Sequence, residues 1–530
     1  MSDAAVLSIE TPAPVEAGGV SRRAWYGYLA LALGSFMAVL DIQIVASSIN
    51  EIQVGLSASI DEIQWVQTSY LIAEVIAVPL SGYMARMLST RVYYVISALG
   101  FTLASAACAG SWSLGSMVVF RAIQGLFGGG MIPTSFATMF LLFPAGKARG
   151  TAQVIGGMMT MMASSLGPTI GGYITQHMSW HWLFLLNFIP GTLCAVLVWK
   201  LIDIDRPQPE MWRRMDIPGL AFMAIFLGTL EYTLDDGPRH DWFSQQSVAI
   251  CASLAIVSGV LFFWRVLTTD HPIIELHAFR NRNFAASSMI STLLGVCMFT
   301  LIYLTPIFLG QVRGYNPQQI GDIMMIQGVS MFLSAPIAGR INLTWDPRAV
   351  ILLGLGLIGT GTWLNGHMTD QWGFAQFALP QALRGAGFIF SFIPITNLAI
   401  GTLPSSDVHN ASGLFNVTRN IGGAIGLALV STLINHATWA NWQALAESTR
   451  LSREPVREAL GSMSSALAPT MGDASHGGAI AMLARMVEQQ AATITYNDMY
   501  QLLTWVVLLA MLAVPLLQRP RHGTSGELGH

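Results

Sequence analysis

The chain contains about fourteen apolar stretches, and each is long enough to cross a lipid bilayer as a helix. The hydrocarbon core of a bilayer is about 30 Å thick, so a spanning helix needs roughly 20 apolar residues. Of the 530 residues, 53% are hydrophobic and only 10% are charged, which is too apolar for an ordinary soluble domain. The sequence therefore predicts an all-α polytopic membrane protein. The stretches lie near residues 25–49, 62–84, 91–110, 114–139, 150–174, 180–200, 216–236, 246–268, 284–310, 317–340, 348–368, 372–402, 410–435 and 498–518.

The basic residues between these spans are distributed unequally. The N-terminal side of the membrane carries Arg22, Arg23, Arg86, Arg91, Lys147, Arg149, Lys200, Arg206, Arg213, Arg214, Arg265, Arg280, Arg282, Arg340, Arg348, Arg519 and Arg521. The opposite side carries only Arg239, Arg313, Arg450, Arg453, Arg457 and Arg485. Because loops rich in Lys and Arg stay in the cytoplasm, we expect both termini to be cytoplasmic. The net charge of −3 is thinly spread and suggests no nucleic-acid partner.

Short motifs recur at matching places in the two parts of the chain. Pro79-Leu-Ser-Gly82 closes the second span, and Pro336-Ile-Ala-Gly339 closes the tenth. Gln124-Gly125 lies in the fourth span, and Arg384-Gly385 lies in the twelfth. The constant offset of eight spans indicates two six-helix halves joined by an inserted pair of helices. Such internal repeats are typical of secondary transporters; a chance recurrence of helix-packing motifs is the alternative.

The repeat and the spans together predict the domain organisation. We expect a cytoplasmic tail at 1–24, a six-helix half at 25–200, a linker with inserted helices 7 and 8 at 201–268, a second six-helix half at 269–518 and a cytoplasmic tail at 519–530. Within the second half, residues 436–497 form one long external segment. Ile480, Leu483, Ala484 and Val487 recur there at helical spacing, which predicts an amphipathic helix whose apolar stripe needs a partner.

A segment rich in small residues lies at 163–172 and reads Ala-Ser-Ser-Leu-Gly-Pro-Thr-Ile-Gly-Gly. It follows Arg121-Ala-Ile-Gln-Gly125 and precedes Trp180-His-Trp-Leu-Phe-Leu-Leu-Asn-Phe-Ile-Pro-Gly191. In this order the three segments resemble the antiporter signature of the major facilitator superfamily. The resemblance is to its fourteen-helix drug:proton antiporters of the EmrB and QacA type, with the EmrB type nearer, and it runs from about residue 25 to about residue 518.

This resemblance implies a major facilitator fold and a transporter rather than an enzyme. It implies proton-coupled multidrug efflux across the bacterial inner membrane by alternating access, with hydrophobic or amphipathic toxic compounds as substrates and antibiotic resistance as the outcome. The proton motive force would drive the cycle, without a cofactor or a metal ion. An exporter dedicated to one endogenous metabolite, such as a siderophore, a fatty acid or a secondary product, is the alternative.

EmrB-type pumps work with a periplasmic adaptor and an outer-membrane channel. The resemblance therefore makes segment 436–497 a candidate docking site for an adaptor. A segment folded back onto the protein's own outer mouth is the alternative.

The small-residue segment is expected to serve the conformational cycle. Pro168 cannot donate a helix hydrogen bond, and Gly167, Gly171 and Gly172 allow a neighbouring helix to approach closely. We expect a hinge or seal between the two halves here. Tight helix packing without a role in transport is the alternative.

Asp41 and Arg121 form the charged pair that we expect to couple protons to transport. Asp41 lies roughly 12 Å from the outer end of its span, and Arg121 lies roughly 10 Å from the outer end of its own, at 1.5 Å per residue. An apolar surround favours the neutral acid and a nearby guanidinium favours the carboxylate, so protonation can respond to the substrate. Both residues match signature positions of the resembled family. A structural ion pair is the alternative.

Other side chains within the spans predict a substrate cavity. Glu74 lies near mid-membrane, where it is a candidate second proton site or an anchor for a cationic substrate; a buried group satisfied by an unseen donor is the alternative. Glu231 closes the seventh span near the outer face. Met158 and Met162 carry soft thioethers that repack around unlike molecules, although lipid-facing filler explains any single Met equally well.

Two arginines and one loop are expected to take part in the change between states. Arg384 and Arg419 lie within the second half, where Arg419 could bind carboxylates or helix C-termini in one state; a fixed packing role is the alternative. The loop after the second span departs from the superfamily, because Arg86 stands where many members carry Asp and Ser89 where they carry Gly. We therefore expect the usual inner charge lock between the halves to be absent or rewired.

Overall fold

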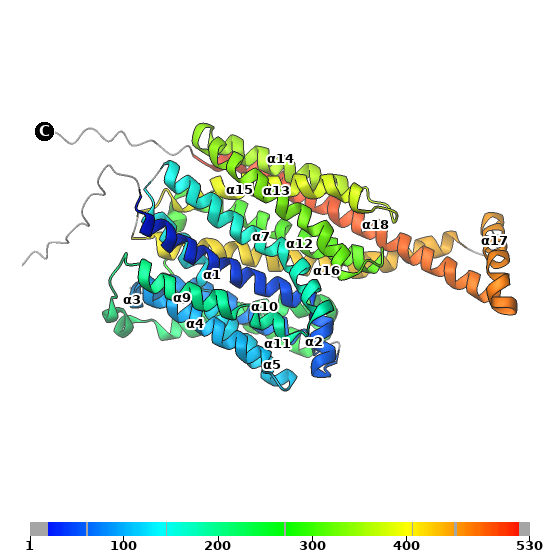
Figure 1. The fold of residues 1–530 in the computed structure, drawn as a ribbon, viewed down its shortest axis with the longest axis horizontal. Helices are drawn as coiled ribbons and strands as arrows, with labels where there is room; N and C mark the ends of the chain where they lie inside the picture. The colour runs from blue at the N-terminus through cyan, green and yellow to red at the C-terminus, as the bar shows by residue number, and fades with distance from the viewer. Residues whose placement is uncertain are drawn as a thin grey trace, which may run out of the picture.

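The computed structural model is a bundle of long helices from which a helical extension projects (Figure 1). It describes residues 20–59, 62–144, 146–269, 272–404, 406–449 and 453–518, and every structural statement below concerns these residues. The predicted tail at 519–530 and most of the tail at 1–24 lie outside them.

The first six predicted spans form the first half of the bundle. Its helices are α1 (Arg22–Ser47), α2 (Ile49–Leu56), α3 (Trp65–Leu88), α4 (Thr90–Ala109), α5 (Leu114–Gly128), α6 (Met131–Leu142), α7 (Lys147–His177), α8 (His181–Leu185) and α9 (Phe188–Leu201). The predicted spans 114–139 and 180–200 are each divided into two helices, α5 with α6 and α8 with α9.

The remaining spans form the inserted pair and the second half. The elements, with η for a short 3₁₀-helix, are η1 (Pro209–Arg214), α10 (Ile217–Asp236), η2 (Gly237–Arg239), η3 (Trp242–Ser244), α11 (Gln246–Thr268), η4 (Leu276–Arg280), α12 (Arg282–Gln311), α13 (Pro317–Thr344), α14 (Pro347–Asn365), α15 (Phe374–Ile400), α16 (Val408–Ser448), α17 (Glu454–Met471), η5 (Gly472–Ala474), α18 (Ser475–Ala513) and η6 (Val514–Leu516). Each of the predicted spans therefore falls on one or two helices.

Thirteen helical stretches of the described chain are long and apolar enough to cross a membrane. The prediction of fourteen spans adds α7, which has 31 residues but is rich in Gly, Ser, Thr and Met. This composition suits its place, because α7 is packed between α1 of its own half and α13 of the other half. Small residues permit close helix contact on both sides.

The two breaks within spans have local causes. The fourth span breaks at three consecutive glycines, 128–130, which weaken helix continuity. The sixth span breaks at Leu186 and Asn187. Pro190 has no N–H with which to bond the carbonyl of Leu186, so α9 begins afresh beyond the break.

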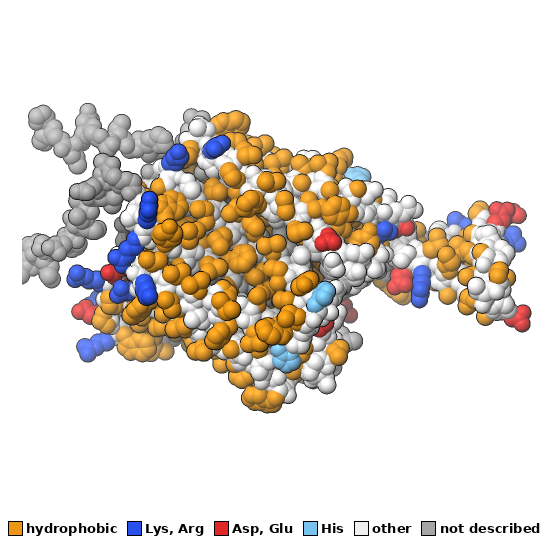
Figure 2. Space-filling view, in the orientation of Figure 1, with side chains coloured by type: hydrophobic (Ala, Val, Ile, Leu, Met, Phe, Trp, Pro, Cys, Tyr) orange, Lys and Arg blue, Asp and Glu red, His pale blue; other side chains and the backbone are white. Residues whose placement is uncertain are grey.

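Basic side chains gather at one end of the bundle. On the visible face, Lys and Arg lie mostly over the left end, whereas the extension projects from the right end (Figure 2). This end, where α1 begins and α9 ends, is called the basic end below. The charge asymmetry predicted from the sequence is thus present in the folded chain.

The two halves are in contact at the basic end. A side chain at Gly82 of α3 would collide with the backbone of His409 in α16, and Ser412 of α16 donates a 2.7 Å hydrogen bond to the carbonyl of Pro133 in α6. The rings of Phe136 and Phe392 lie 5.7 Å apart across the same seam. This end of the central seam is therefore closed.

The inserted helices bridge the seam at the opposite end. Trp65 of α3 stacks on Tyr232 of α10, with ring centroids 5.4 Å apart. From the other side, Trp242 of η3 donates a 3.0 Å hydrogen bond to Thr432 of α16. The pair α10 and α11 therefore contacts both halves through α3 and α16 rather than hanging free at the periphery.

The predicted external segment is almost wholly helical. α16 and α18 continue out of the bundle, and α17 lies at the tip (Figure 1). The helix predicted around Ile480 is confirmed, but an unpartnered stripe is wrong in part: Val487 is buried and Leu483 half-buried, because α18 packs on α16 and α17. Ile480 of the predicted stripe stays 44% exposed, and Met482 and Met486 beside it are each 48% exposed.

Candidate functional site

Asp41 and Arg121 meet in the interior of the first half. Nη1 of Arg121 lies 2.6 Å from Oδ2 of Asp41, and both side chains are fully inaccessible to solvent. The depth match predicted from the sequence is thus confirmed. Arg121 also donates to the carbonyl of Val66 at 3.0 Å, and its guanidinium lies 4.3 Å from the ring centroid of Tyr70. Such contacts stabilise a buried guanidinium.

Two amide side chains complete the site around Asp41. Gln124 donates to Oδ1 of Asp41 at 3.0 Å and accepts from Nη1 of Arg121 at 2.8 Å. Asn187 donates to the same Oδ1 at 2.6 Å and to Ser105 at 3.0 Å. The carboxylate is therefore held by donors from two other spans, one of them at the break between α8 and α9.

Close backbone contact between α5 and α3 positions Arg121. A side chain at Gly125 would overlap the carbonyl of Tyr70, and one at Gly129 would overlap the carbonyl of Glu74. Glycines four residues apart form one face of a helix, and they allow the two backbones to approach directly. Arg121 lies one turn before Gly125 on this face.

The second half contains a counterpart without an acid. Gly385 packs on the carbonyl of Gln327 as Gly125 packs on that of Tyr70, which supports the predicted repeat. The residues one and four positions before the glycine are exchanged, so that Arg384 and Gln381 occupy the places of Gln124 and Arg121.

Arg384 is fully buried and donates to Gln381 and, at 3.4 Å, to Thr305. Its Nε and Nη1 have no hydrogen-bond partner among the described residues. Of the two halves, as far as the structure describes them, only the first therefore holds a buried pair of opposite charges.

Glu74, Glu231 and Arg419 face the central seam from three different helices. Glu74 of α3 is 6% exposed and lies within electrostatic range of Arg121 and of Arg419 on α16. Glu231 of α10 is half-buried and within electrostatic range of Glu74. Arg419 donates a 2.7 Å hydrogen bond to Asn416 and forms no ion pair among the described residues. The seam thus combines two carboxylates with a guanidinium that attracts one of them, Glu74, without forming an ion pair among the described residues.

The two predicted cavity methionines lie on α7. Met158 is half-buried and packs against the hydrophobic core shared by the two halves. Met162, one turn further along α7, is also half-buried. Next to them, a side chain at Gly157 would contact Phe392 of α15, so this face of α7 borders the second half.

The small-residue segment contacts both halves, with its glycines at 167 and 171 directed at its own half. Gly167, Pro168, Gly171 and Gly172 are all buried. A side chain at Gly167 would overlap Gln43 of α1, and one at Gly171 would overlap Ser47 of α1. These two glycines thus face α1. The hypothesis of a hinge between the halves assumed instead that they face the other half. The contact with the second half comes from Thr169, which donates a 3.0 Å hydrogen bond to the carbonyl of Gly321 in α13.

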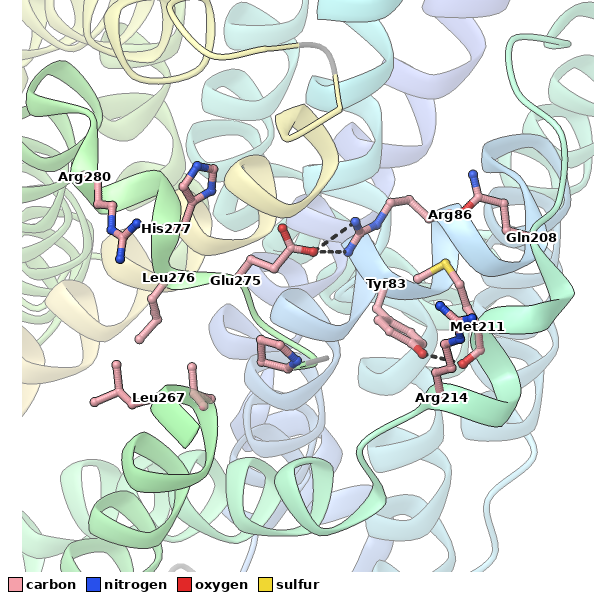
Figure 3. Close-up of a pocket in the computed structure, with 12 residues that line it drawn as sticks. Tyr83, Arg86, Gln208, Met211, Arg214, Leu267, Glu275, Leu276, His277 and Arg280 are labelled. Carbon is pink, nitrogen blue, oxygen red and sulfur yellow. Dashed lines mark hydrogen bonds and ion pairs between the residues drawn. The ribbon is translucent and has the colours of Figure 1, made fainter. Parts of the chain in front are cut away.

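The charge lock at the basic end is rewired as the altered loop suggested. Nη1 and Nη2 of Arg86 both lie 3.1 Å from Oε1 of Glu275, which precedes α12 of the second half (Figure 3). Asn410 donates a 2.9 Å hydrogen bond to the carbonyl of Glu275 and links this latch to α16. Ser89, in the same altered loop, has φ 75° and ψ 148°, a conformation that only glycine adopts without strain.

Gln124, Asn187 and Glu275 are site residues that were not predicted from the sequence. Gln124 and Asn187 are amides within apolar spans, and a polar group in a membrane interior needs a partner. That signal was available for both. Glu275 lies in a loop 189 residues from Arg86, and no local pattern indicates the pairing. Among the described residues, no group of three or more His, Cys, Asp or Glu side chains is placed to hold a metal ion.

Comparison with known proteins identifies close relatives. A model of the Major Facilitator Superfamily matches residues 31–427. The chain is 41% identical to the colistin resistance protein EmrB of Acinetobacter baumannii, over 94% of this chain and 97% of that protein. It is 29% identical to the multidrug export protein EmrB of Escherichia coli K12, over 94% and 96% of the two chains.

Solved structures share the fold at low sequence identity. The proton:xylose symporter XylE has a TM-score of 0.57 and 12% identity, with 91% of this chain and 94% of that chain covered. This likeness concerns the fold alone.

Proposed function

Because this chain belongs to the major facilitator superfamily, and within it to the EmrB family, we propose that it is a proton-coupled multidrug efflux transporter of the bacterial inner membrane. Its substrates are hydrophobic or amphipathic toxic compounds. The observation that carries this proposal is the buried Asp41–Arg121 pair, in a chain whose relatives are named for colistin resistance and multidrug export.

The proposed orientation places the basic end and both termini in the cytoplasm. The gathering of Lys and Arg at that end supports it, because positively charged loops are retained on the cytoplasmic side. The extension formed by α16, α17 and α18 then projects into the periplasm.

Asp41 is the proposed proton carrier, and Arg121 modulates it. Ionised Asp41 attracts the guanidinium and accepts three hydrogen bonds from Arg121, Gln124 and Asn187. Protonation removes that attraction and converts one acceptor oxygen into a donor. The contacts between α1, α5 and the α8–α9 break would then loosen together. Such a change within one half gives the proton a direct effect on helix packing.

Glu74 and Glu231 are the proposed contacts for substrates that carry positive charge. They lie on α3 and α10, beside the seam along which the halves separate. Arg419, from the other half, attracts Glu74 in the present arrangement. A bound cation would compete with Arg419 for Glu74, which would weaken attraction between the halves. Met158 and Met162 supply adaptable apolar surface for the rest of the substrate.

The cycle is proposed to alternate by rocking of the two halves. The closed seam at the basic end corresponds to a state in which the cytoplasm has no access to the centre. Opening that end requires separation of Gly82 from His409 and rupture of the Arg86–Glu275 latch. Arg384 and Arg419 remain candidate elements of the same change. The small-residue face at Gly167 and Gly171 lets α7 shift along α1.

The helical extension is the proposed docking site for a periplasmic adaptor that leads to an outer-membrane channel. Its exposed Met482 and Met486 are the contact we favour. Replacing both with Ser should lower the resistance of intact cells while leaving transport in inverted vesicles unchanged. Leu483→Ser with Val487→Ser is the comparison, because these side chains pack within the chain; it should reduce folded protein instead. Equal loss in cells and vesicles for the Met pair would contradict docking there.

Reconstitution tests the transport proposal directly. Purified protein in liposomes should move a lipophilic cationic dye against its gradient when a pH gradient is imposed, and an ionophore that dissipates the gradient should stop it. No dye movement under any imposed pH gradient would overturn proton coupling. A deletion strain tests the substrate range, because hypersensitivity to several unrelated amphiphiles indicates multidrug export. Accumulation of one endogenous metabolite without such hypersensitivity indicates the dedicated exporter.

A further inference from the structure

A cavity of about 680 Å³ lies at the basic end, where the inserted helices meet both halves (Figure 3). Its walls come from the end of α3, from η1, from the end of α11 and from the segment that leads into α12. The groups assigned above to proton coupling and substrate contact do not line it. The cavity is therefore distinct from the proposed proton and substrate sites, although the Arg86–Glu275 latch forms part of its wall.

Positive charge dominates the cavity. Arg86 is bound to Glu275, whereas no carboxylate lies within ion-pair distance of Arg214 or Arg280 among the described residues. In Figure 3, Arg280 lies on one wall, and Arg86 and Arg214 lie on the opposite wall. The Nε of Arg86 has no hydrogen-bond partner in the described chain. His277, also on the wall, contacts Asp407 at 3.8 Å. An anion in the cavity would thus face guanidinium groups from both halves.

Apolar surface adjoins these charges. Leu267, at the end of α11, lines the cavity and is 77% exposed, and Leu276 and Met211 line it as well. Trp212 and Trp264 lie close by in the chain and are 63% and 59% exposed. Exposed Trp side chains mark the headgroup level of a membrane. The cavity therefore combines guanidinium groups with an apolar wall at the depth where lipid headgroups lie.

We propose that this cavity binds the phosphate headgroup of an anionic phospholipid, with the arginines on the phosphate and Leu267 against the start of an acyl chain. Guanidinium groups bind phosphate oxygens through paired N–H donors. A lipid fits better than a free phosphate because a fully hydrated ion would make no use of the apolar wall. The leaflet is the one on the basic side, which is cytoplasmic in the orientation proposed above; binding itself does not depend on that orientation.

Lipid binding to the purified full-length protein tests the proposal. Native mass spectrometry in detergent compares retention of phosphatidylglycerol with that of phosphatidylcholine, and we expect clear preference for phosphatidylglycerol. Each arginine near an anionic headgroup contributes about fivefold in affinity, so Arg214→Gln with Arg280→Gln should lower phosphatidylglycerol affinity about 25-fold. Arg213→Gln is the matched control, because Arg213 lies on the same turn and does not line the cavity.

The outcomes separate a bound lipid from a bound soluble anion and from a general effect of charge. Arg214 and Arg280 are exposed, so the double variant should keep the wild-type thermal midpoint. Equal retention of the two lipids, or equal loss in the Arg213 control, would overturn the proposal. Displacement of phosphatidylglycerol by millimolar inorganic phosphate, at a concentration where chloride has no effect, would assign the site to soluble phosphate instead. Dye export plays no part in these readouts, so failure of the transport proposal would leave them interpretable.

Discussion

Replacing Asp41 with Asn distinguishes a proton carrier from a structural ion pair. The carboxylate accepts hydrogen bonds from Arg121, Gln124 and Asn187 at 2.6, 3.0 and 2.6 Å. An amide offers one accepting oxygen and one donating nitrogen, so at least one of these three donors loses its acceptor. The buried Arg121 guanidinium also loses its counter-charge. Removing one partner of a buried pair costs about 3–5 kcal/mol.

We therefore expect Asp41→Asn to lower the thermal midpoint in detergent and to abolish export driven by a pH gradient. The double variant Asp41→Asn with Arg121→Gln replaces the pair with two neutral amides, so that no uncompensated charge stays buried. Its thermal midpoint should recover most of the loss. Export should stay absent, because neither amide binds and releases a proton. Stability and transport are thereby measured on the same folded protein.

Arg384→Gln in the second half provides the matched comparison. It removes a buried guanidinium that has no carboxylate within ion-pair distance among the described residues, so the thermal midpoint should fall less than in Asp41→Asn. Export driven by a pH gradient in the folded double variant would refute Asp41 as the proton carrier and transfer the role to Glu74. A double variant no more stable than Asp41→Asn would refute the unpaired Arg121 charge as the cause of the instability.

Three further changes test packing, strain and the latch. Gly167→Val inserts a branched side chain between α7 and α1 and should slow dye export more than it lowers the amount of folded protein; Gly356→Val, with open space around it, should do neither. Ser89→Gly relieves a positive φ of 75° and should raise the free energy of unfolding by about 1 kcal/mol, seen as a higher thermal midpoint; an unchanged midpoint would contradict strain there. Arg86→Glu should open the basic end. A pair of cysteines introduced on the two sides of the seam should then no longer cross-link, and adding Glu275→Arg should restore the cross-link.

Features set by one-dimensional pattern could be predicted from the sequence. The spans follow from runs of apolar residues, and the pairing of Asp41 with Arg121 follows from equal depth, because a membrane fixes the height of each residue in every helix. The residues that hydrogen-bond to this pair could be identified only from the three-dimensional structure. Asn187 reaches Asp41 only because the sixth span breaks beside it, and Pro190 causes a break that hydropathy does not reveal.

Contacts between distant segments were the least predictable. Arg86 was recognised as a departure from the family, yet its partner Glu275 lies outside every span and carries no motif. The stripe at Leu483 and Val487 was recognised as apolar, but its periodicity is the same whether another protein or the chain itself covers it. Here α18 packs on α16 and α17, which leaves Val487 buried and Leu483 half-buried while Ile480 stays 44% exposed. Periodicity thus specifies that a face is buried and leaves its partner open.

The continuity of α16 has a mechanical consequence. One unbroken helix runs from Val408, at the closed seam, to Ser448 on the extension. At 1.5 Å per residue it is about 60 Å long. If it turns as a rigid rod about its contact with α3 near Gly413, a rotation of about 10° moves its far end by about 10 Å. The extension is then a lever arm, and a protein that grips it would be pushed and pulled once in each transport cycle.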